Sequence, residues 1–126
     1  MYYIAIPSYD RAESLLTKTL NTLQKGKVPS NRIYIFVANQ SQYNIYKQII
    51  KGYTIIIGKL GITNQRIFIK NYFKEGDQVV SIDDDVEEVN KLNGDKLNKV
   101  HNLDIFFKES FIRIQKENLF IWGIYP

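Results

Sequence analysis

The sequence contains no cysteine, no long apolar run and no basic cluster. The lack of cysteine excludes disulfide bonds and thiolate metal ligands and is compatible with a reducing compartment. No apolar stretch approaches the roughly 18 residues that a membrane-spanning helix needs. The segment Met1 to Ile6 lacks the basic region and the long apolar core of a signal peptide. We therefore expect a cytoplasmic protein with no membrane span.

The composition is that of an ordinary globular domain. The chain has 126 residues, of which 44% are hydrophobic and 24% charged, and it includes nine Tyr and seven Phe. This length and apolar content predict a single domain over residues 1–126 with a substantial core. The net charge of +4 is spread along the chain. It would suit an anionic substrate or a nucleic acid and decides neither.

Short apolar runs alternate with segments of helical spacing, which predicts an α/β fold. The runs are continuously apolar, as in parallel strands covered on both faces. We expect a Rossmann-like, mostly parallel sheet flanked by helices, with right-handed crossovers. The polar segment 87–102 carries a turn signal at Asn93-Gly94-Asp95 and predicts a hairpin or a mobile loop. The expected strands are 2–6, 32–39, 53–58, 78–82 and 119–126, and the expected helices are 10–26, 41–50, 62–76 and 103–118.

Helix boundaries are predicted from capping residues. Asp10, with Glu13 three positions later, predicts an N-cap with a capping box. Gly26 and Gly76 predict helix C-termini, and Asn102 predicts the N-cap of the last helix. The apolar side chains expected to face the core from these helices are Leu15, Leu16, Leu20, Leu23, Ile62, Ile69, Phe73, Leu103, Phe107, Phe111 and Ile114.

Three adjacent carboxylates, Asp83, Asp84 and Asp85, follow the strand at 78–82. If the strand geometry continues, Asp83 and Asp85 share one face with Cα atoms about 6.5–7 Å apart, and Asp84 points to the other. Such a pair can share Mg²⁺ or Mn²⁺, which prefer oxygen ligands. The alternative is a solvated acidic turn that caps the next element.

Other polar residues fall at the same predicted edge, because ligands bind at the carboxyl ends of parallel strands. Pro7 to Arg11 follow the first strand and Gly58 to Gly61 follow the third. Arg66 lies about one turn into the following helix, where an anion is favoured. For Arg66 and Lys59 the alternative is a surface cation, and for Arg11 a salt bridge at a helix start.

The segments "IAIPSYDRAESLLTKTLNTL" and "GKLGITNQRIFIKNYFKEGDQVVSIDDDV" resemble the nucleotide-sugar-binding half of GT-A glycosyltransferases. That family begins with a strand, an I-P-[ST]-[YN]-x-R segment and a helix. It continues with a helix that carries (A/Q)-R and reaches a strand that ends in D-x-D. The ending "FIWGIYP" is similar to glycosyltransferases associated with viral and phage base modification, which would place the protein in a host cytoplasm. The resemblance covers nearly the whole chain.

The resemblance implies a role for each matching residue outside the triplet. Pro7, Ser8 and Tyr9, with Arg11 beside them, match the loop that holds the nucleotide base. A second matching segment flanks the base, the ribose and the phosphates and would add positive charge to the site. Its matching residues are Gly61, Gln65 and Arg66, and the neighbouring Lys59 would add further positive charge.

Within the triplet, the resemblance assigns the metal to the outer two residues. Asp83 matches the first Asp of D-x-D, which faces the ribose or the metal. Asp85 matches the last, which binds the Mn²⁺ or Mg²⁺ that carries the diphosphate. Asp84 fills the variable position beside the nucleotide sugar.

The sequence departs from the family pattern at two points. Ile67 stands where many relatives carry Asn. Inverting enzymes of the family also place a catalytic Asp or Glu well after the D-x-D, and the acids after Asp85 show no such motif. We expect a minimal fold, a fragment of a longer protein, or an unusual base, so the catalytic residue stays unassigned.

Two aromatic residues outside these blocks have alternative interpretations. Trp122, beside Gly123 at the end of the last strand, would contact a sugar or acceptor, or else belong to the core. His101, the one histidine, is predicted to be exposed in a loop, with a role as a further metal ligand as the alternative.

The sequence therefore supports two hypotheses for the function. The first is a metal-dependent glycosyltransferase that takes a nucleoside-diphosphate sugar, with a UDP-sugar as first candidate. Its acceptor would be a glycan, a protein or a nucleic-acid base, and transfer would proceed with or without inversion. The second is a GT-A-like module that binds a nucleotide sugar without transfer. The oligomeric state is open and includes a homodimer.

Overall fold

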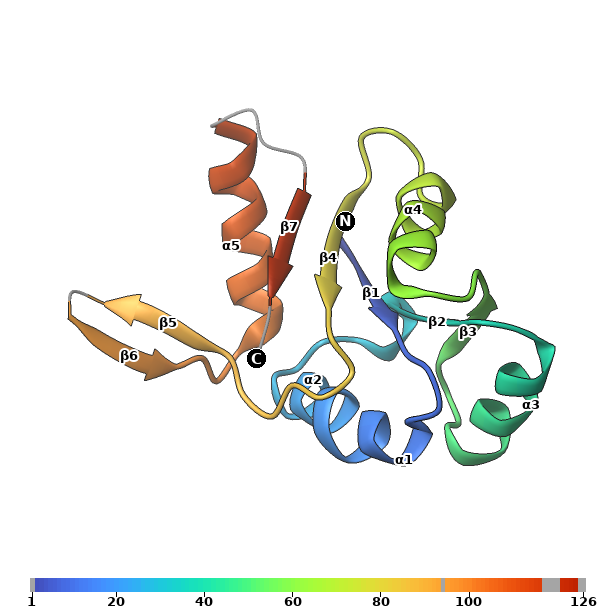
Figure 1. The fold of residues 1–126 in the computed structure, drawn as a ribbon. Helices are drawn as coiled ribbons and strands as arrows, with labels where there is room; N and C mark the ends of the chain where they lie inside the picture. The colour runs from blue at the N-terminus through green and yellow to red at the C-terminus, as the bar shows by residue number, and fades with distance from the viewer. Residues whose placement is uncertain (1, 94, 117–120, 125–126) are drawn as a thin grey trace.

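A computed structural model describes residues 2–93, 95–116 and 121–124, with the backbone alone at 91–93, 113–116 and 121–124. Its main sheet has five parallel strands in the order β3-β2-β1-β4-β7 (Figure 1). The predicted α/β, Rossmann-like parallel sheet is confirmed. The strands are β1 (Tyr2–Pro7), β2 (Ile33–Val37), β3 (Thr54–Ile57), β4 (Gln78–Ile82) and β7 (Ile121–Ile124).

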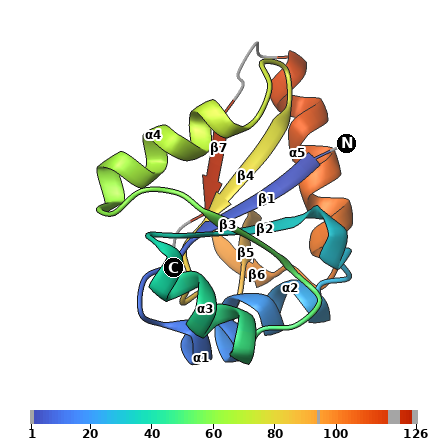
Figure 2. The same ribbon diagram turned by 90° about the vertical axis from the view of Figure 1, so that its right-hand side faces the viewer.

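Helices cover both faces of this sheet (Figure 2). One face carries α3 (Gln40–Ile49), α5 (Leu103–Lys116) and a helical segment made of α1 (Ala12–Leu15), the π turn η1 (Leu16–Leu20) and α2 (Asn21–Lys25). The other face carries α4 (Ile62–Tyr72), and a 3₁₀ turn (Ser30–Arg32) precedes β2. Among the described residues, no helix is both long and apolar enough to cross a lipid bilayer.

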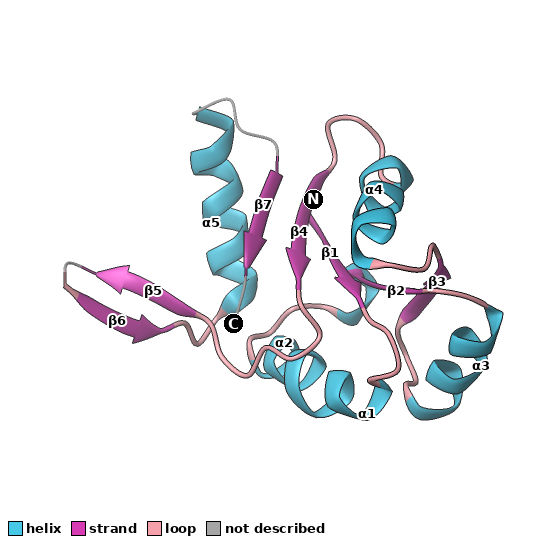
Figure 3. Cartoon of the chain, in the orientation of Figure 1, coloured by secondary structure: helices cyan, strands magenta, loops and turns pink. Residues whose placement is uncertain are grey.

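The segment after β4 forms the hairpin that was one of the two predictions for it. Strands β5 (Asn90–Asn93) and β6 (Lys96–Lys99) pair antiparallel and project from the body of the molecule (Figure 3). Beyond the hairpin, His101 is exposed before α5, as predicted. The cap of α5 is also confirmed, because Asn102 Oδ1 accepts a hydrogen bond of 3.0 Å from the Ile105 amide.

The alternating strand residues divide into two apolar clusters, one on each face. Tyr2, Ile4 and Ile6 of β1 face the larger cluster, while Ala5 faces the smaller one under α4. Most predicted core positions are buried, and Phe73 is partly buried against the smaller cluster. Leu16 and Ile62 are exposed, so their assignment to the core was wrong. The Ile114 side chain lies outside the described part of the structure.

Two helix ends differ from the prediction, and a third, at Gly26, is at the predicted residue but has a different conformation. Asp10 is not the N-cap of α1, because it has a left-handed φ of 54° and Arg11 occupies the cap position without a side-chain hydrogen bond. Gly26 has φ −80°, and Lys27 takes the left-handed conformation instead. Helix α4 ends at Tyr72, before Gly76.

Close packing against Leu103 explains why residue 26 is a glycine. A Cβ atom there would lie 2.6 Å from the Leu103 side chain. The Gly26 carbonyl also accepts hydrogen bonds from the amides of Leu103 at 2.8 Å and Asp104 at 3.2 Å. The start of α5 is therefore fixed directly against the end of α2.

The last connection does not follow the predicted right-handed rule. From β1 to β2 the chain advances towards the β3 edge, and from β4 to β7 it advances towards the opposite edge. Helices α1, α2 and α5 nevertheless share one face (Figure 2). The two connections therefore have opposite hands, and the prediction is wrong for one of them. The docking of α5 on Gly26 holds it to that face.

The central strands of the sheet have their carboxyl ends at nearly the same level along the strand direction. Pro7 pairs with Phe36, Val37 with Ile57, and Ala5 with Ser81. The loops that follow β1, β3 and β4 consequently meet at one edge of the sheet.

Candidate functional site

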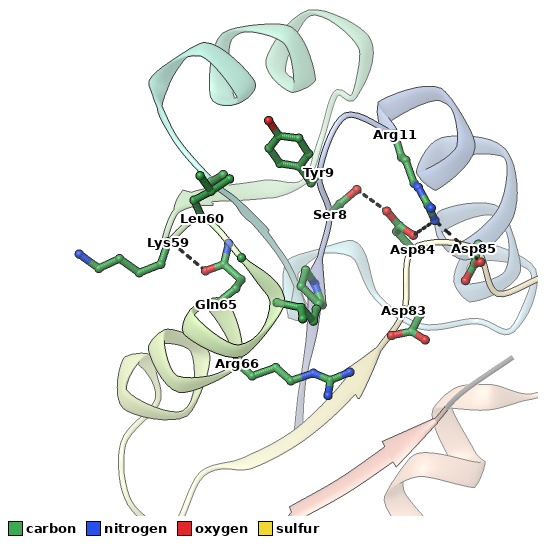
Figure 4. A pocket seen from close by; sticks show the side chains of 14 residues that line it. Ser8, Tyr9, Arg11, Lys59, Leu60, Gln65, Arg66, Asp83, Asp84 and Asp85 are labelled. Atoms are coloured by element: carbon green, nitrogen blue, oxygen red, sulfur yellow. Dashed lines mark hydrogen bonds and ion pairs between the residues drawn. The ribbon is translucent and has the colours of Figure 1, made fainter.

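A cleft of about 640 Å³ lies at this edge. It is formed by the loops after β1, β3 and β4 and by the first turn of α4 (Figure 4). All eleven residues predicted for nucleotide-sugar or metal binding line it: Pro7, Ser8, Tyr9, Arg11, Lys59, Gly61, Gln65, Arg66, Asp83, Asp84 and Asp85. Three further lining residues, Ala38, Leu60 and Ile62, were not predicted.

The acidic triplet does not continue the strand. Strand β4 ends at Ile82, and the chain then turns at Asp84 and Asp85. Asp84 is 7% exposed and accepts hydrogen bonds from Ser8 Oγ at 2.8 Å and Arg11 Nη1 at 3.4 Å. Asp85 is more exposed and lies 4.0 Å from the same guanidinium. The extended geometry predicted for the triplet is wrong, and Asp84 is a buried part of the site.

A chain of hydrogen bonds from α3 fixes Asp84 and the loop after β1. The Tyr46 hydroxyl lies 2.6 Å from Ser8 Oγ and accepts a bond of 3.0 Å from the Arg11 amide. Since Ser8 gives its only hydroxyl proton to Asp84, Tyr46 is the donor to Ser8. Burial raises the pKa of Tyr46, which keeps this donor protonated. Sequence patterns gave no sign of Tyr46, because its role depends on the packing of α3.

The third carboxylate of the triplet, Asp83, lies on the side of the cleft towards α4 (Figure 4). Burial raises the pKa of Asp83 above its ordinary value, and the nearby charge of Asp85 adds to the increase. The positive charge of Arg66 partly offsets it. Figure 4 shows the Arg66 side chain extending from α4 towards Asp83. Arginine and carboxylate groups from α4 and from the loops after β1 and β4 therefore meet at this end of the cleft.

Gln65 supports the wall of the cleft through its side-chain amide. Its Oε1 accepts a hydrogen bond of 2.9 Å from the Lys59 amide, and its Nε2 donates one of 3.1 Å to the Val37 carbonyl. A Cβ at Gly58 would lie 2.0 Å from Gln65 Oε1, so this close approach needs glycine. Gln65 thus positions the turn that leads into α4.

The start of α4 presents backbone amides to the cleft. Gly61 is the N-cap residue, with a φ of 90° that favours glycine, and it makes no side-chain cap. The first amides of a helix have no partner within the helix and attract anions. Arg66 adds a side-chain positive charge, whereas Figure 4 shows the Lys59 side chain pointing away from the acidic turn.

The opposite end of the cleft is apolar. Tyr9 and Leu60 line it although they are 53% and 60% exposed, and Ile62, at 56% exposed, also lines the cleft. Figure 4 shows Tyr9 and Leu60 on the side of the cleft away from Asp85. Large apolar side chains gathered around one concave surface indicate a ligand site.

The remaining predicted contacts, Trp122 and Gly123, are described by the structure only in their backbone. Their backbone belongs to β7 and pairs with Val80 and Ser81 of β4. The Trp122 side chain lies outside the described part of the structure, so the predicted sugar or acceptor contact stays a prediction.

In the part of the chain that the structure describes, no group of three or more His, Asp or Glu side chains could hold a metal ion. A cation at the triplet would therefore take further ligands from a bound molecule or from water. Comparison with protein-family models, curated proteins and solved structures found no match.

Proposed function

We propose that the chain is a metal-dependent glycosyltransferase of GT-A type that binds a nucleoside-diphosphate sugar, with a UDP-sugar as first candidate. The observation that carries this proposal is the division of one cleft into an apolar end and a charged end. A nucleotide sugar has the same two parts, a planar base and an anionic diphosphate. The volume of about 640 Å³ is within the range of small-molecule sites.

The apolar end suits the base and the charged end suits the diphosphate. The base would lie against Tyr9 and Leu60. Stacking of a base on an aromatic ring is favourable and does not depend on which base it is. The diphosphate would lie between the amides at the start of α4 and the guanidinium of Arg66. Arg11, on the other side of the triplet, adds a second positive charge near the phosphates.

The donor set of the triplet fits a hard divalent cation. Asp83 and Asp85 offer carboxylate oxygens that remain partly exposed, while Asp84 is engaged with Ser8 and Arg11. Carboxylates combined with substrate phosphates are the usual ligands of Mg²⁺, and Mn²⁺ also prefers oxygen. When bound, Mn²⁺ or Mg²⁺ would neutralise the diphosphate and stabilise it as a leaving group.

The proposed reaction is a displacement at the anomeric carbon of the sugar. The bond from that carbon to the diphosphate oxygen breaks, and its electron pair remains on the diphosphate. An acceptor hydroxyl forms the new bond and loses its proton to a base. Arg66 and the α4 amides stabilise the charge that develops on the diphosphate.

Calorimetry with UDP, in the presence and absence of Mn²⁺, tests the binding step. We expect micromolar to millimolar affinity that requires Mn²⁺ and falls at least tenfold in Asp85→Asn. A hydrolysis and transfer assay with UDP-glucose, UDP-galactose and UDP-N-acetylglucosamine then tests turnover. UDP binding that is independent of Mn²⁺ and unchanged in Asp85→Asn would contradict the proposed role of the triplet.

A second candidate function is nucleotide-sugar binding without transfer. The observation in its favour is that the triplet supplies all the carboxylates among the described residues that line the cleft, so no separate base faces it. Mn²⁺-dependent UDP binding with no hydrolysis or transfer from any of the three sugar donors would favour this function.

A further inference from the structure

We propose that Thr19, on the buried side of the helical segment α1–η1–α2, is a positioning residue that holds the acidic turn in its ligand-binding shape. Thr19 is fully buried. Its hydroxyl donates a hydrogen bond of 2.7 Å to the Asp83 carbonyl and accepts one of 2.9 Å from the Val86 amide. A single side chain thus bonds both ends of the four-residue turn that contains Asp84 and Asp85. This inference rests on the proposed function of the triplet.

The hydroxyl uses its one proton and one of its two lone pairs in these two contacts. A threonine hydroxyl has one proton to donate, and here it goes to Asp83 while a lone pair receives the Val86 amide. Both partners are backbone groups, so the contact fixes the path of the main chain rather than one side chain. The Val86 side chain is buried in the larger core cluster and anchors the end of the turn.

The π turn η1 contains Thr19. It spans Leu16–Leu20 between two α-helical segments, and such π bulges occur often at functional sites. Thr22 follows three positions later and faces the same side of the helix. Its hydroxyl lies 2.8 Å from the Lys18 carbonyl of its own helix and 2.9 Å from the carbonyls of both Val86 and Glu87, so its single proton is shared between the helix and the end of the turn.

This arrangement explains how three adjacent carboxylates keep a defined geometry. Neighbouring carboxylates repel one another, and an unsupported turn would open to separate them. The side chains of Ser8 and Arg11 form hydrogen bonds with the side chain of Asp84, whereas Thr19 bonds the main chain at Asp83 and Val86. The Thr19 hydroxyl supplies that restraint and keeps Asp83 and Asp85 directed at one ligand. Groups that orient ligand residues commonly affect metal affinity by 10- to 100-fold.

The test compares Thr19→Val, which has the same shape without the hydroxyl, with Thr19→Ser, which keeps it. Thr17→Val is the matched control, because the exposed Thr17 hydroxyl bonds only the helix carbonyls of Glu13 and Ser14. Two measurements are made on each variant. Electron paramagnetic resonance of free Mn²⁺ in the presence of UDP gives the affinity, and amide hydrogen exchange by NMR gives the protection of Val86.

We expect Thr19→Val to weaken Mn²⁺ binding in the presence of UDP by roughly 10- to 100-fold and to increase exchange at the Val86 amide. Thr19→Ser should restore both values towards those of the wild type, and Thr17→Val should change neither. Wild-type affinity in Thr19→Val, or equal losses in Thr19→Val and Thr19→Ser, would overturn the proposal.

The two proposals fail in different ways. If the wild-type chain binds neither Mn²⁺ nor UDP, the proposed function is wrong, whereas Val86 exchange still reports whether Thr19 holds the turn. If Thr19→Val does not fold, Thr22→Val takes its place, because Thr22 is half-buried and bonds the far end of the same turn. A severalfold loss of Mn²⁺ affinity in a folded Thr22→Val would support the restraint, and unchanged affinity would overturn it.

Discussion

The hydroxyl of Tyr46 is expected to stabilise the whole protein as well as the site. Tyr46→Phe removes a hydroxyl that accepts from the Arg11 amide at 3.0 Å and donates to Ser8 at 2.6 Å. The ring is fully buried, so water does not replace these bonds at its position. Leaving buried polar groups without partners costs about 1–3 kcal/mol. We expect a loss of about 2 kcal/mol in the free energy of unfolding.

For a chain of this length, that loss corresponds to a decrease of roughly 7–8 °C in melting temperature, at roughly 4 °C per kcal/mol. Urea denaturation followed by circular dichroism gives the free energy, and calorimetry gives the melting temperature. The matched control is Tyr43→Phe on the same helix, whose hydroxyl makes no hydrogen bond recorded among the described residues, although Lys47 lies over its ring. We expect this variant to stay within about 0.5 kcal/mol of the wild type.

The pH dependence provides an independent check on the same residue. Burial raises the pKa of Tyr46 in the folded state. Its contribution to stability is therefore fully present below the unfolded value of about 10 and is lost as the pH rises through the folded value. The difference between wild type and Tyr46→Phe should be constant from pH 6 to 9. Equal stability of Tyr46→Phe and Tyr43→Phe in this range would refute the proposed hydrogen-bond chain.

Three further changes test the fold around the site. Gly26→Ala should lower the free energy of unfolding by about 1–3 kcal/mol in urea denaturation, because its Cβ would overlap the start of α5; an unchanged value would contradict that packing. Gly58→Ala should displace the Gln65 amide and weaken UDP binding measured by calorimetry, so wild-type affinity would show that Gln65 does not shape the cleft. Burial alone would raise the pKa of Asp104. The hydrogen bonds from Tyr2 and Lys108, with the positive charges of Lys108 and Arg32, instead lower this pKa. Its stabilisation is therefore lost as the pH falls below about 4, and urea denaturation should show a steeper acid loss for wild type than for Asp104→Asn.

The sheet and its helices were largely predictable, because each element carries its own periodic pattern. Strand β4 begins and ends at the predicted residues, 78 and 82, and the Asn102 cap is formed as expected. The predicted helix start at Asp10 was wrong, and Gly26 ends its helix without the left-handed conformation typical of such a glycine. Asp10 donates its amide to Gln42 of α3, and Gly26 packs on α5. Both residues are determined by contacts with elements distant in sequence.

The composition of the cleft was also predictable, whereas its internal arrangement was not. The rule that ligands bind at the carboxyl ends of parallel strands, together with the family resemblance, which includes Gln65 and Arg66, identified eleven of the lining residues. Strand alternation then assigned Asp84 to the far face, but the chain turns after Ile82 and Asp84 is bonded to Ser8. Alternation fails at this point because it holds only while the backbone stays extended.

The sequence by itself determined which strands are buried, that they run parallel, and which residues reach their carboxyl edge. These properties follow from local patterns of apolar and polar side chains. Only the tertiary structure decided how the acidic triplet is held. Thr19 and Tyr46 read as ordinary helix residues, and they acquire their roles because helix packing brings their hydroxyls within 3 Å of the turn and of Ser8. A hydrogen bond between residues far apart in the chain leaves no periodic signal in the sequence, so it becomes visible only in the folded protein.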